Sequence, residues 1–370
     1  MSDDAADTDT YALRSADLPE IVAPDVDYQP PRPKGAHRIG MIGTGGISAS
    51  HLDAYRAAGW DVAALWNRTK AKAEAKASEF CPNARIEDDW RAVIANADID
   101  VVDITLHPEH RTEIVEAALR AGKHVLSQKP FVTDLDTGER LVALAQDNGV
   151  KLAVNQNGRW APHLSWMRQA VRDGHVGELV SAHVALHWNH GWTAGTPFDQ
   201  IADLILYDFG VHWFDFLNSV IGDRLEAVTA TTTHAAGQTN AVPLLAQAIV
   251  RFDGGQASLI LDGGLAHGAR DTTYIGGTKG SLIADGPDLG QQEVRLVTEA
   301  GVARPVLEGQ WFNDGFGGAM GELMCAIEED REPSNGAAEN LRSLALTFAA
   351  VESRMTGREV AVGAARRLMS

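Results

Sequence analysis

From residue 37 to residue 155, short apolar runs alternate along the chain with amphipathic stretches. We predict strands at residues 37–42, 61–66, 100–105, 123–127 and 151–155, and helices near 47–58, 69–79, 110–121 and 134–148. Strands that alternate with helices are typical of βαβ units, and their right-handed crossovers build a doubly wound parallel sheet. The ligand site of such a sheet lies at the carboxyl ends of its strands.

The pattern changes after about residue 156. A helix near 162–173 is followed by period-two segments, which predict strands at residues 179–187, 225–233, 244–252, 256–262, 271–276 and 291–298. One face of this antiparallel or mixed sheet should pack on helices. Residues 201–221 are apolar nearly all round and predict one buried helix, and two more helices are expected near 315–329 and 337–355.

Residues 1–35 resemble neither part, since they hold eight acidic residues and five prolines without a sustained apolar period. We interpret them as a solvated tail or as an extended arm, which would strap a partner subunit. The predicted division is an arm over 1–35, an α/β domain over 36–155 and an α+β domain over 156–370. The last domain should hold a large, open, mainly antiparallel sheet, and its C-terminal helices would pack back on the α/β domain.

The composition limits the class of function. At 370 residues, 45% of them apolar, the chain suits about two packed domains. Its net charge of −18 argues against nonspecific binding to nucleic acid or an anionic membrane, although about seven of these charges lie in the first thirty residues. Only two cysteines are present, no apolar run approaches the ~20 residues of a membrane span, and the start MSDDAADTDT is not a signal peptide, so we expect a cytoplasmic protein.

A glycine-rich loop, Gly43-Thr44-Gly45-Gly46-Ile47-Ser48, follows the first predicted strand and opens a helix. This is the context of the dinucleotide fingerprint, in which glycines allow a tight turn and let the backbone approach a pyrophosphate. Amides at the helix N-terminus bind the pyrophosphate. We therefore predict that residues 36–155 form a Rossmann domain that binds a nicotinamide dinucleotide.

The end of the second predicted strand bears on the choice of cofactor. An NAD site usually carries a carboxylate there, whereas this chain has Asn67 and Arg68. Because a guanidinium pairs well with a 2′-phosphate, we favour NADP over NAD. The alternative is that Arg68 stacks on the adenine or lies in solvent.

Candidate groups for hydride chemistry follow. Lys129 ends the fifth strand, where it would stabilise a developing alkoxide, the alternative being an ordinary surface lysine. Within the predicted helix 201–221, Asp208, His212 and Asp215 share one face, and Gly210 lies opposite, where it would allow close packing. His212 would accept a hydroxyl proton, while Asp208 would orient the hydroxyl or raise the basicity of the imidazole. A satisfied core His–Asp pair is the alternative.

The segment from His187 to Trp192 is both aromatic and polar. Trp188, His190 and Trp192 are suited to stack on a sugar ring and bind its hydroxyls. With Asp208 and His212 the histidines also allow a zinc site, but that spacing is not diagnostic, and we predict no metal.

These motifs resemble the glucose-fructose oxidoreductase, inositol dehydrogenase and rhizopine-catabolism (Gfo/Idh/MocA) oxidoreductases over about residues 37–362. The similarity rests on GTGGIS, DITLHPEH, AGKHVLSQKP, GRWAP, DFGVHWFD and the ending from PSNGAAENL to GREV. The resemblance implies a nucleotide-binding domain and a second domain whose open sheet associates, so a homodimer or homotetramer is expected.

The resemblance also implies roles for particular residues. It makes Lys129 the catalytic lysine, His212 the base and Asp208 its acidic neighbour. The expected cofactor contacts are Gly43, Thr44, Gly45, Gly46, Ile47, Asn67, Arg68, Thr105, His107, His110, Gln128, Lys129, Asn157 and Trp160. The expected substrate contacts are Lys129, Arg159, Trp188, His190, Trp192, Asp208 and His212. Gln128 replaces the family's usual Glu, and His107 stands where Asn is frequent.

The predicted function is reversible oxidation of a secondary hydroxyl on a sugar, sugar derivative or cyclitol by NADP or NAD. One alternative is a glycosidase that uses bound NAD to oxidise, eliminate, hydrate and reduce. The other is a noncatalytic sensor that binds nucleotide.

Overall fold

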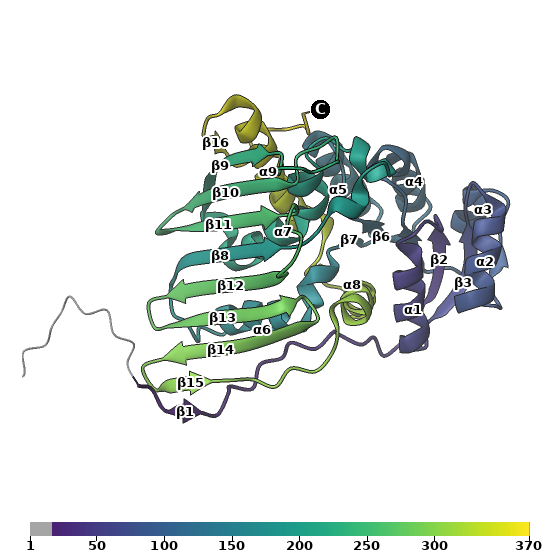
Figure 1. Ribbon diagram of the computed structural model, residues 1–370. Coiled ribbons are helices and arrows are strands. Elements are labelled where there is room, and N and C mark those ends of the chain that lie inside the picture. The colour runs from purple at the N-terminus through teal and green to yellow at the C-terminus, as the bar shows by residue number, and fades with distance from the viewer. Residues whose placement is uncertain (1–16, 370) are drawn as a thin grey trace, which may run out of the picture.

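The computed structural model describes residues 17–369, which form two β-sheets with helices packed on them (Figure 1). A parallel sheet lies on one side of the molecule and a larger mixed sheet on the other (Figure 1). The predictions for residues 1–16 fall outside the described residues.

The parallel sheet has the strand order β4-β3-β2-β5-β6-β7. Its strands are β2 (Arg38–Ile42), β3 (Asp61–Trp66), β4 (Arg85–Ile86), β5 (Val101–Ile104), β6 (His124–Gln128) and β7 (Leu152–Asn155). The helices among them are α1 (Ser48–Ala58), α2 (Lys70–Phe80), α3 (Trp90–Ala95), α4 (Pro108–Arg120) and α5 (Leu135–Asp147). The chain begins at β2 in the middle and winds to each side in turn, so the topological switch point lies between β2 and β5. The predicted doubly wound sheet is confirmed.

Burial explains why these strands were recognisable. Every residue of β5 is buried, and β2 is buried except at Arg38, because helices cover both faces of the sheet. The prediction omitted β4, which has two residues, and α3, which has six. Elements this short do not repeat a hydrophobic period often enough to be recognised.

The mixed sheet has the order β1-β15-β14-β13-β12-β8-β11-β10-β9-β16. Its strands are β1 (Glu20–Ile21), β8 (Leu179–His187), β9 (Leu225–Thr233), β10 (Leu245–Phe252), β11 (Gly255–Asp262), β12 (Arg270–Gly277), β13 (Gly280–Asp288), β14 (Gln291–Thr298), β15 (Gly301–Ala303) and β16 (Val360–Ala361). Among the described residues of this mixed sheet, only the pairs β8–β11 and β1–β15 are parallel. The expected mainly antiparallel sheet is confirmed, although β1, β13, β15 and β16 were not predicted.

Helices cover one face of the mixed sheet. These are α6 (Pro162–Arg172), α7 (Val211–Ile221) and α9 (Ala337–Thr356), which lie behind the strands in Figure 1. Along β10, Ala246, Ala248 and Val250 are buried beneath them, while Ile249 between them is 58% exposed. The other face is therefore open, and association of copies through it stays a prediction. A further helix, α8 (Trp311–Glu328), packs against α1 and thus joins the two parts.

The segment 201–221 is not one α-helix, contrary to the prediction. It contains a π-helical turn, η4 (Ile205–Phe209), and α7 begins only at Val211. The Gly210 amide donates to the carbonyl of Ile205, five residues earlier, at 2.8 Å. A Cβ at Gly210 would lie 2.5 Å from the Leu206 carbonyl oxygen, so the glycine accommodates the turn's own backbone rather than a neighbouring element.

The described part of the arm, residues 17–35, is extended and lies on its own chain. Strand β1 pairs with β15, and the following segment runs along the lower side of the molecule to β2 (Figure 1). The Ser165 hydroxyl donates to the Tyr28 carbonyl at 2.7 Å, and the Glu328 carboxylate accepts from the Lys34 and Gly35 amides. Residues 17–35 are therefore not a solvated tail.

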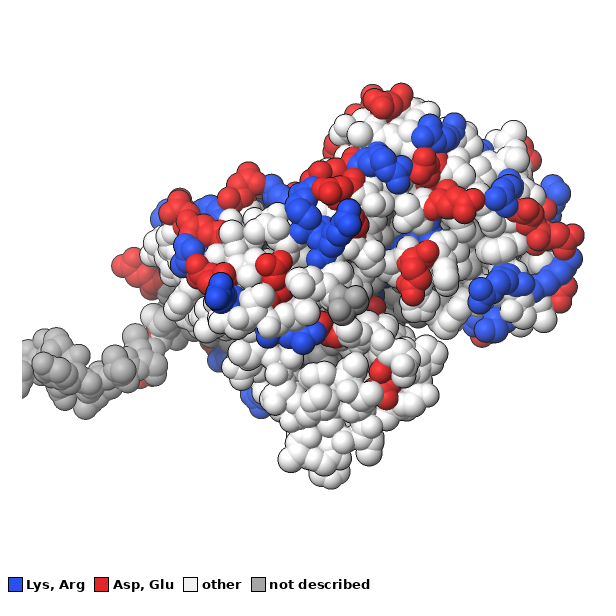
Figure 2. Space-filling view, turned by 90° about the horizontal axis from the view of Figure 1, so that it is seen from above, with Lys and Arg blue, Asp and Glu red and all other residues white. Residues whose placement is uncertain are grey.

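Charged side chains of both signs are mixed on the face that Figure 2 shows, and no continuous basic stretch crosses that face. The exclusion of nucleic acid and anionic membranes rests on net charge and stays a prediction. Among the described residues, no helix is both long and apolar enough to cross a membrane.

Candidate active site

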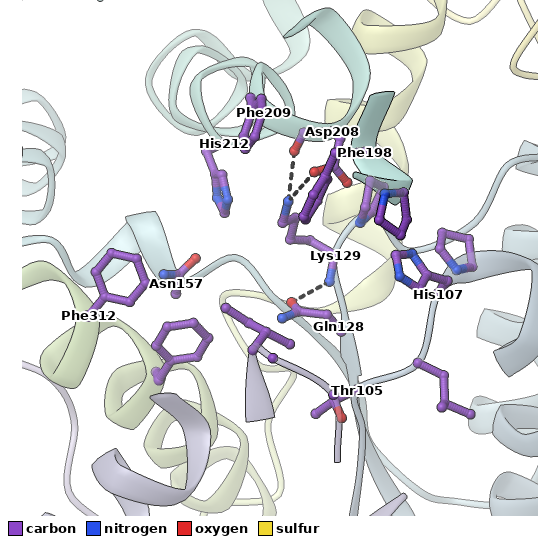
Figure 3. Close-up of a pocket in the computed structure, with 18 of the residues that line it drawn as sticks. Thr105, His107, Gln128, Lys129, Asn157, Phe198, Asp208, Phe209, His212 and Phe312 are labelled. Atoms are coloured by element: carbon purple, nitrogen blue, oxygen red, sulfur yellow. Dashed lines mark hydrogen bonds and ion pairs between the residues drawn. The ribbon is translucent and has the colours of Figure 1, made fainter. Parts of the chain in front are cut away.

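A cavity of about 1350 Å³ lies at the carboxyl ends of the parallel strands, and residues of both sheet regions line it (Figure 3). The predicted site residues in its lining are Gly45, Gly46, Ile47, Asn67, Arg68, Thr105, His107, His110, Gln128, Lys129, Asn157, Trp188, His190, Trp192, Asp208 and His212. Four other predicted residues, Gly43, Thr44, Arg159 and Trp160, lie outside the lining.

The glycine-rich loop joins β2 to α1. Gly43 has φ +103°, and a Cβ there would lie 2.9 Å from the Thr105 hydroxyl, which donates to the Gly43 carbonyl at 2.7 Å. At Gly45 and Gly46, by contrast, an added Cβ would meet no atom within 4 Å. Gly43 therefore allows the turn to pack closely against Thr105. Gly45 and Gly46 leave open space at the helix N-terminus, and this open cradle suits a pyrophosphate.

An amide and two cations line the cavity beyond the end of β3, the second cation on helix α2. Asn67 accepts from the Thr44 amide at 3.0 Å and donates to the Thr69 carbonyl at 3.1 Å, so its side chain fixes the two loops to each other. Arg68 and Lys72 are exposed at the cavity and form no ion pair within residues 17–369. This end of the cavity is therefore positive. Lys72 was not predicted, because one lysine on an exposed helix face gives no signal.

The reaction centre is built from the end of β6 and from η4. The Lys129 ammonium donates to the main-chain carbonyl of Asp208 at 2.7 Å and lies 3.4 Å from its carboxylate (Figure 3). Both side chains are largely buried, with 15% and 12% exposed. Because two acceptors hold it, the ammonium has a fixed position at the cavity wall.

His212 reaches the same space from the first turn of α7 (Figure 3). Burial lowers its pKa well below the usual value, and the nearby positive Lys129 lowers it further. The imidazole is therefore neutral and ready to accept a proton. Among the described residues, no hydrogen bond or ion pair joins Asp208 to His212, so the structure shows no direct contact through which Asp208 would raise the basicity of the imidazole. Its side chain serves Lys129 instead.

Behind Gln128 lies a buried polar network that the sequence analysis did not predict. His51 Nδ1 lies 2.8 Å from the Asp103 carboxylate, which also accepts from the Tyr55 hydroxyl at 2.8 Å. His51 Nε2 faces the side-chain amides of Asn155 at 3.0 Å and Gln128 at 3.3 Å. Since amide nitrogens donate, Nε2 is the acceptor and the proton lies on Nδ1. The sequence feature that could have revealed this network is the carboxylate of Asp103 in an otherwise apolar strand.

The network reaches the reaction centre through Gln128. Its Oε1 accepts from the Lys129 main-chain amide at 2.7 Å, while its amide nitrogen faces His51. His51, Asp103 and Asn155 have no exposed surface, and Gln128 is 6% exposed. A fully buried chain of partners thus fixes the strand end that carries Lys129.

The comparisons with known proteins agree with this geometry. Residues 37–156 match an oxidoreductase family with an NAD-binding Rossmann fold, and residues 164–283 match the Gfo/Idh/MocA C-terminal domain. The chain belongs to the Gfo/Idh/MocA oxidoreductases. The resemblance stated from the motifs is confirmed.

Gfo/Idh/MocA relatives match over most of their length. The inositol 2-dehydrogenase of Rhizobium meliloti (strain 1021) is 26% identical over 88% of this chain and 99% of its own. The D-apiose dehydrogenase of Paraburkholderia graminis is 28% identical over 86% of this chain and 88% of its own. An Agrobacterium radiobacter oxidoreductase in complex with NAD⁺, L-tartaric acid and magnesium shares the fold, with a TM-score of 0.80 and 21% identity over 89% of this chain and 99% of that chain.

In this Gfo/Idh/MocA protein, Arg159 and Asp215 are structural partners. The Arg159 guanidinium donates to the two Asp215 carboxylate oxygens at 2.7 and 2.9 Å, and Ser343 donates to the same carboxylate at 2.8 Å. Both members are buried, as is Trp160 beside them. Arg159 therefore does not line the cavity, and Asp215 pairs with Arg159 instead of lining the cavity with His212.

The lining also holds aromatic residues that were not predicted, namely Trp66, Trp90, Phe198, Phe209, Trp213, Trp311, Phe312 and Phe316. Phe209 and Trp213 lie within the DFGVHWFD motif, where their apolar character was assigned to a helix core. The zinc alternative finds no support, since no three His, Cys, Asp or Glu side chains gather as metal ligands among residues 17–369.

Proposed function

We propose that this oxidoreductase transfers a hydride between a nicotinamide dinucleotide and a secondary hydroxyl or ketone of a sugar, sugar derivative or cyclitol. The observation that carries the proposal is that Lys129 and His212 line the same cavity as the open glycine cradle. An inositol dehydrogenase and an apiose dehydrogenase among the relatives support the substrate class.

The residues present fit a dinucleotide. Gly45 and Gly46 offer a backbone cradle for the pyrophosphate, and Thr105, His107 and Gln128 would lie along the nicotinamide half. The bound nicotinamide supplies the hydride acceptor at C4.

Lys129 and His212 divide the remaining chemistry. Lys129 would donate a hydrogen bond to the reacting oxygen and stabilise its developing negative charge. His212, neutral because its pKa is lowered, would take the hydroxyl proton as the hydride leaves the carbon. Since His212 Nδ1 is buried, we assign Nε2 as the atom that accepts the hydroxyl proton. In the reverse direction His212 returns that proton to the ketone oxygen.

We infer a preference for NADP from the positive end of the cavity. Arg68 and Lys72 both line it beside Asn67. Because residue 67 is an asparagine, no carboxylate stands at that position to repel a 2′-phosphate. Replacement of Arg68 by Ala should raise the KM for NADP about tenfold and leave the KM for NAD nearly unchanged. An equal rise in the KM for NADP and the KM for NAD in Arg68→Ala would remove the basis for the NADP preference.

The function is tested by following nicotinamide reduction with NAD and NADP against monosaccharides, anhydrosugars, cyclitols and glycosides. We expect reduction with at least one sugar or cyclitol and loss of it in Lys129→Met. A protein that binds the cofactor but reduces it with no member of the panel would support the sensor alternative instead.

A further inference from the structure

A continuous series of aromatic rings leads from His212 to the cavity mouth. We call Trp311, Trp213, Trp188, His190, Phe209, Phe198 and Trp192 the aromatic wall, because all seven line the cavity. Ring centroids are 5.9 Å apart for His212 and Trp311, 6.1 Å for Trp311 and Trp213, and 5.7 Å for Trp213 and Trp188. The series continues at 5.8 Å to His190, 4.5 Å to Phe209, 6.2 Å to Phe198 and 5.5 Å to Trp192.

The outer end of this series is far more exposed than its inner end. Trp213 is 3% exposed and Trp311 7%, whereas Trp192 at the other end is 57% exposed. Burial lowers the pKa of His190 to about 4, so this ring is uncharged near neutral pH. The aromatic wall is thus an uncharged surface that begins at the reaction centre and ends in solvent. An exposed apolar surface that lines a cavity marks a binding groove.

Hydrogen-bonding groups gather at the inner end of the wall. Lys129, Asp208 and His212 surround the reacting position there. Nearer the mouth, the Thr196 hydroxyl is used in its own turn, since it donates to the Thr193 carbonyl at 2.7 Å. The Asp288 carboxylate likewise accepts from the Gly290 amide and the Gln291 side chain, both at 2.8 Å. The outer rings therefore offer faces for stacking, and the Thr196 hydroxyl in the same segment already uses its donor within its own turn.

We propose that the substrate is a glycoside whose oxidised sugar lies at the inner end and whose aromatic aglycone stacks on Trp192 and Phe198. The proposal rests on the hydride-transfer function given above. The cavity, at about 1350 Å³, exceeds the 300–1,000 Å³ of common ligand pockets, which leaves room for a dinucleotide together with a two-ring substrate. Offset or edge-on ring contacts stabilise such an aglycone beyond the burial of its area.

The test compares matched methyl and phenyl pyranosides of glucose, galactose and xylose, in both anomeric forms. For the sugar that is oxidised, kcat/KM should be about tenfold higher for the phenyl than for the methyl glycoside. Trp192→Ala and Phe198→Ala should each lower this ratio severalfold. The control is Tyr274→Ala, because Tyr274 is an exposed aromatic residue outside the cavity and its loss should leave the ratio unchanged.

Equal kcat/KM for the two glycosides, or a ratio that neither wall variant changes, overturns the proposal. Titration calorimetry of both glycosides with the cofactor-loaded protein separates this failure from that of the proposed function. If no sugar reduces the cofactor but phenyl glycosides still bind about tenfold more tightly than methyl glycosides, the aglycone contact with the wall is supported and hydride transfer fails. A higher kcat/KM for methyl disaccharides than for phenyl glycosides would assign the outer rings to a second sugar and contradict the aryl aglycone.

Discussion

The Lys129 ammonium lies 2.7 Å from the main-chain carbonyl oxygen of Asp208, and it lies 3.4 Å from the carboxylate of the same residue. This contact joins the end of a parallel strand to the π-helical turn before α7, so the two sheet regions meet at one charged group. Because the partner is partly a backbone oxygen, the position of Lys129 depends on the fold of the turn as well as on the Asp208 side chain.

Replacement of Lys129 by Met should lower kcat/KM by roughly 10²–10⁴-fold, which corresponds to about 3–5 kcal/mol of transition-state stabilisation. The methionine keeps much of the side-chain volume but donates no hydrogen bond to the reacting oxygen. Steady-state kinetics measure the effect, and Lys76→Met on the outer helix α2 is the matched control. Activity within tenfold of the parent would exclude Lys129 from the chemistry.

The pH dependence of oxidation should reflect the lowered pKa of His212. Since burial and the charge of Lys129 both disfavour the imidazolium, His212 stays neutral below pH 6.5, where a free histidine gains a proton. The acid limb of kcat/KM should therefore fall below about pH 6.5. In Lys129→Met the His212 pKa, followed by NMR, should rise because one of its two causes is removed. An unchanged or lower pKa would contradict this electrostatic coupling.

Replacement of Arg159 by Leu should destabilise the protein without changing substrate recognition. It leaves the Asp215 carboxylate buried without its cation, which costs about 3–5 kcal/mol. Chemical denaturation measures the loss, and Arg56→Leu, which breaks an exposed pair with Asp53, should cost no more than about 1 kcal/mol. A rise in the substrate KM at unchanged stability would favour the contact with substrate that the motif predicted.

The sequence predicted the elements whose residues repeat with a clear period and missed those that depend on a partner. Strands β5 and β6 appear as apolar runs because each is buried. Strand β1, with two residues, exists only because β15 lies beside it. The π-helical turn before α7 was likewise hidden, since an apolar segment with Gly210 reads as a continuous helix until the backbone hydrogen bonds are known.

The same limit applies to the site. Lys129, Asp208 and His212 were recognisable as polar residues in apolar surroundings, and the structure brings them to one cavity. Their partners were not recognisable, because spacing along a helix gives a shared face but not the residue opposite. Asp208 therefore seemed to serve His212, and Arg159 seemed free for substrate until the contact with Asp215 was seen.

The most direct test of the central claim follows deuterium from the substrate to the cofactor. A sugar or cyclitol that reduces the nicotinamide is prepared with deuterium on its carbinol carbon, and the reduced cofactor is analysed by mass spectrometry with the parent protein and with Lys129→Met. The account predicts that the deuterium appears on the nicotinamide ring, at a rate roughly 10²–10⁴-fold lower in the variant. Reduced cofactor without deuterium, or equal rates in both proteins, would contradict it.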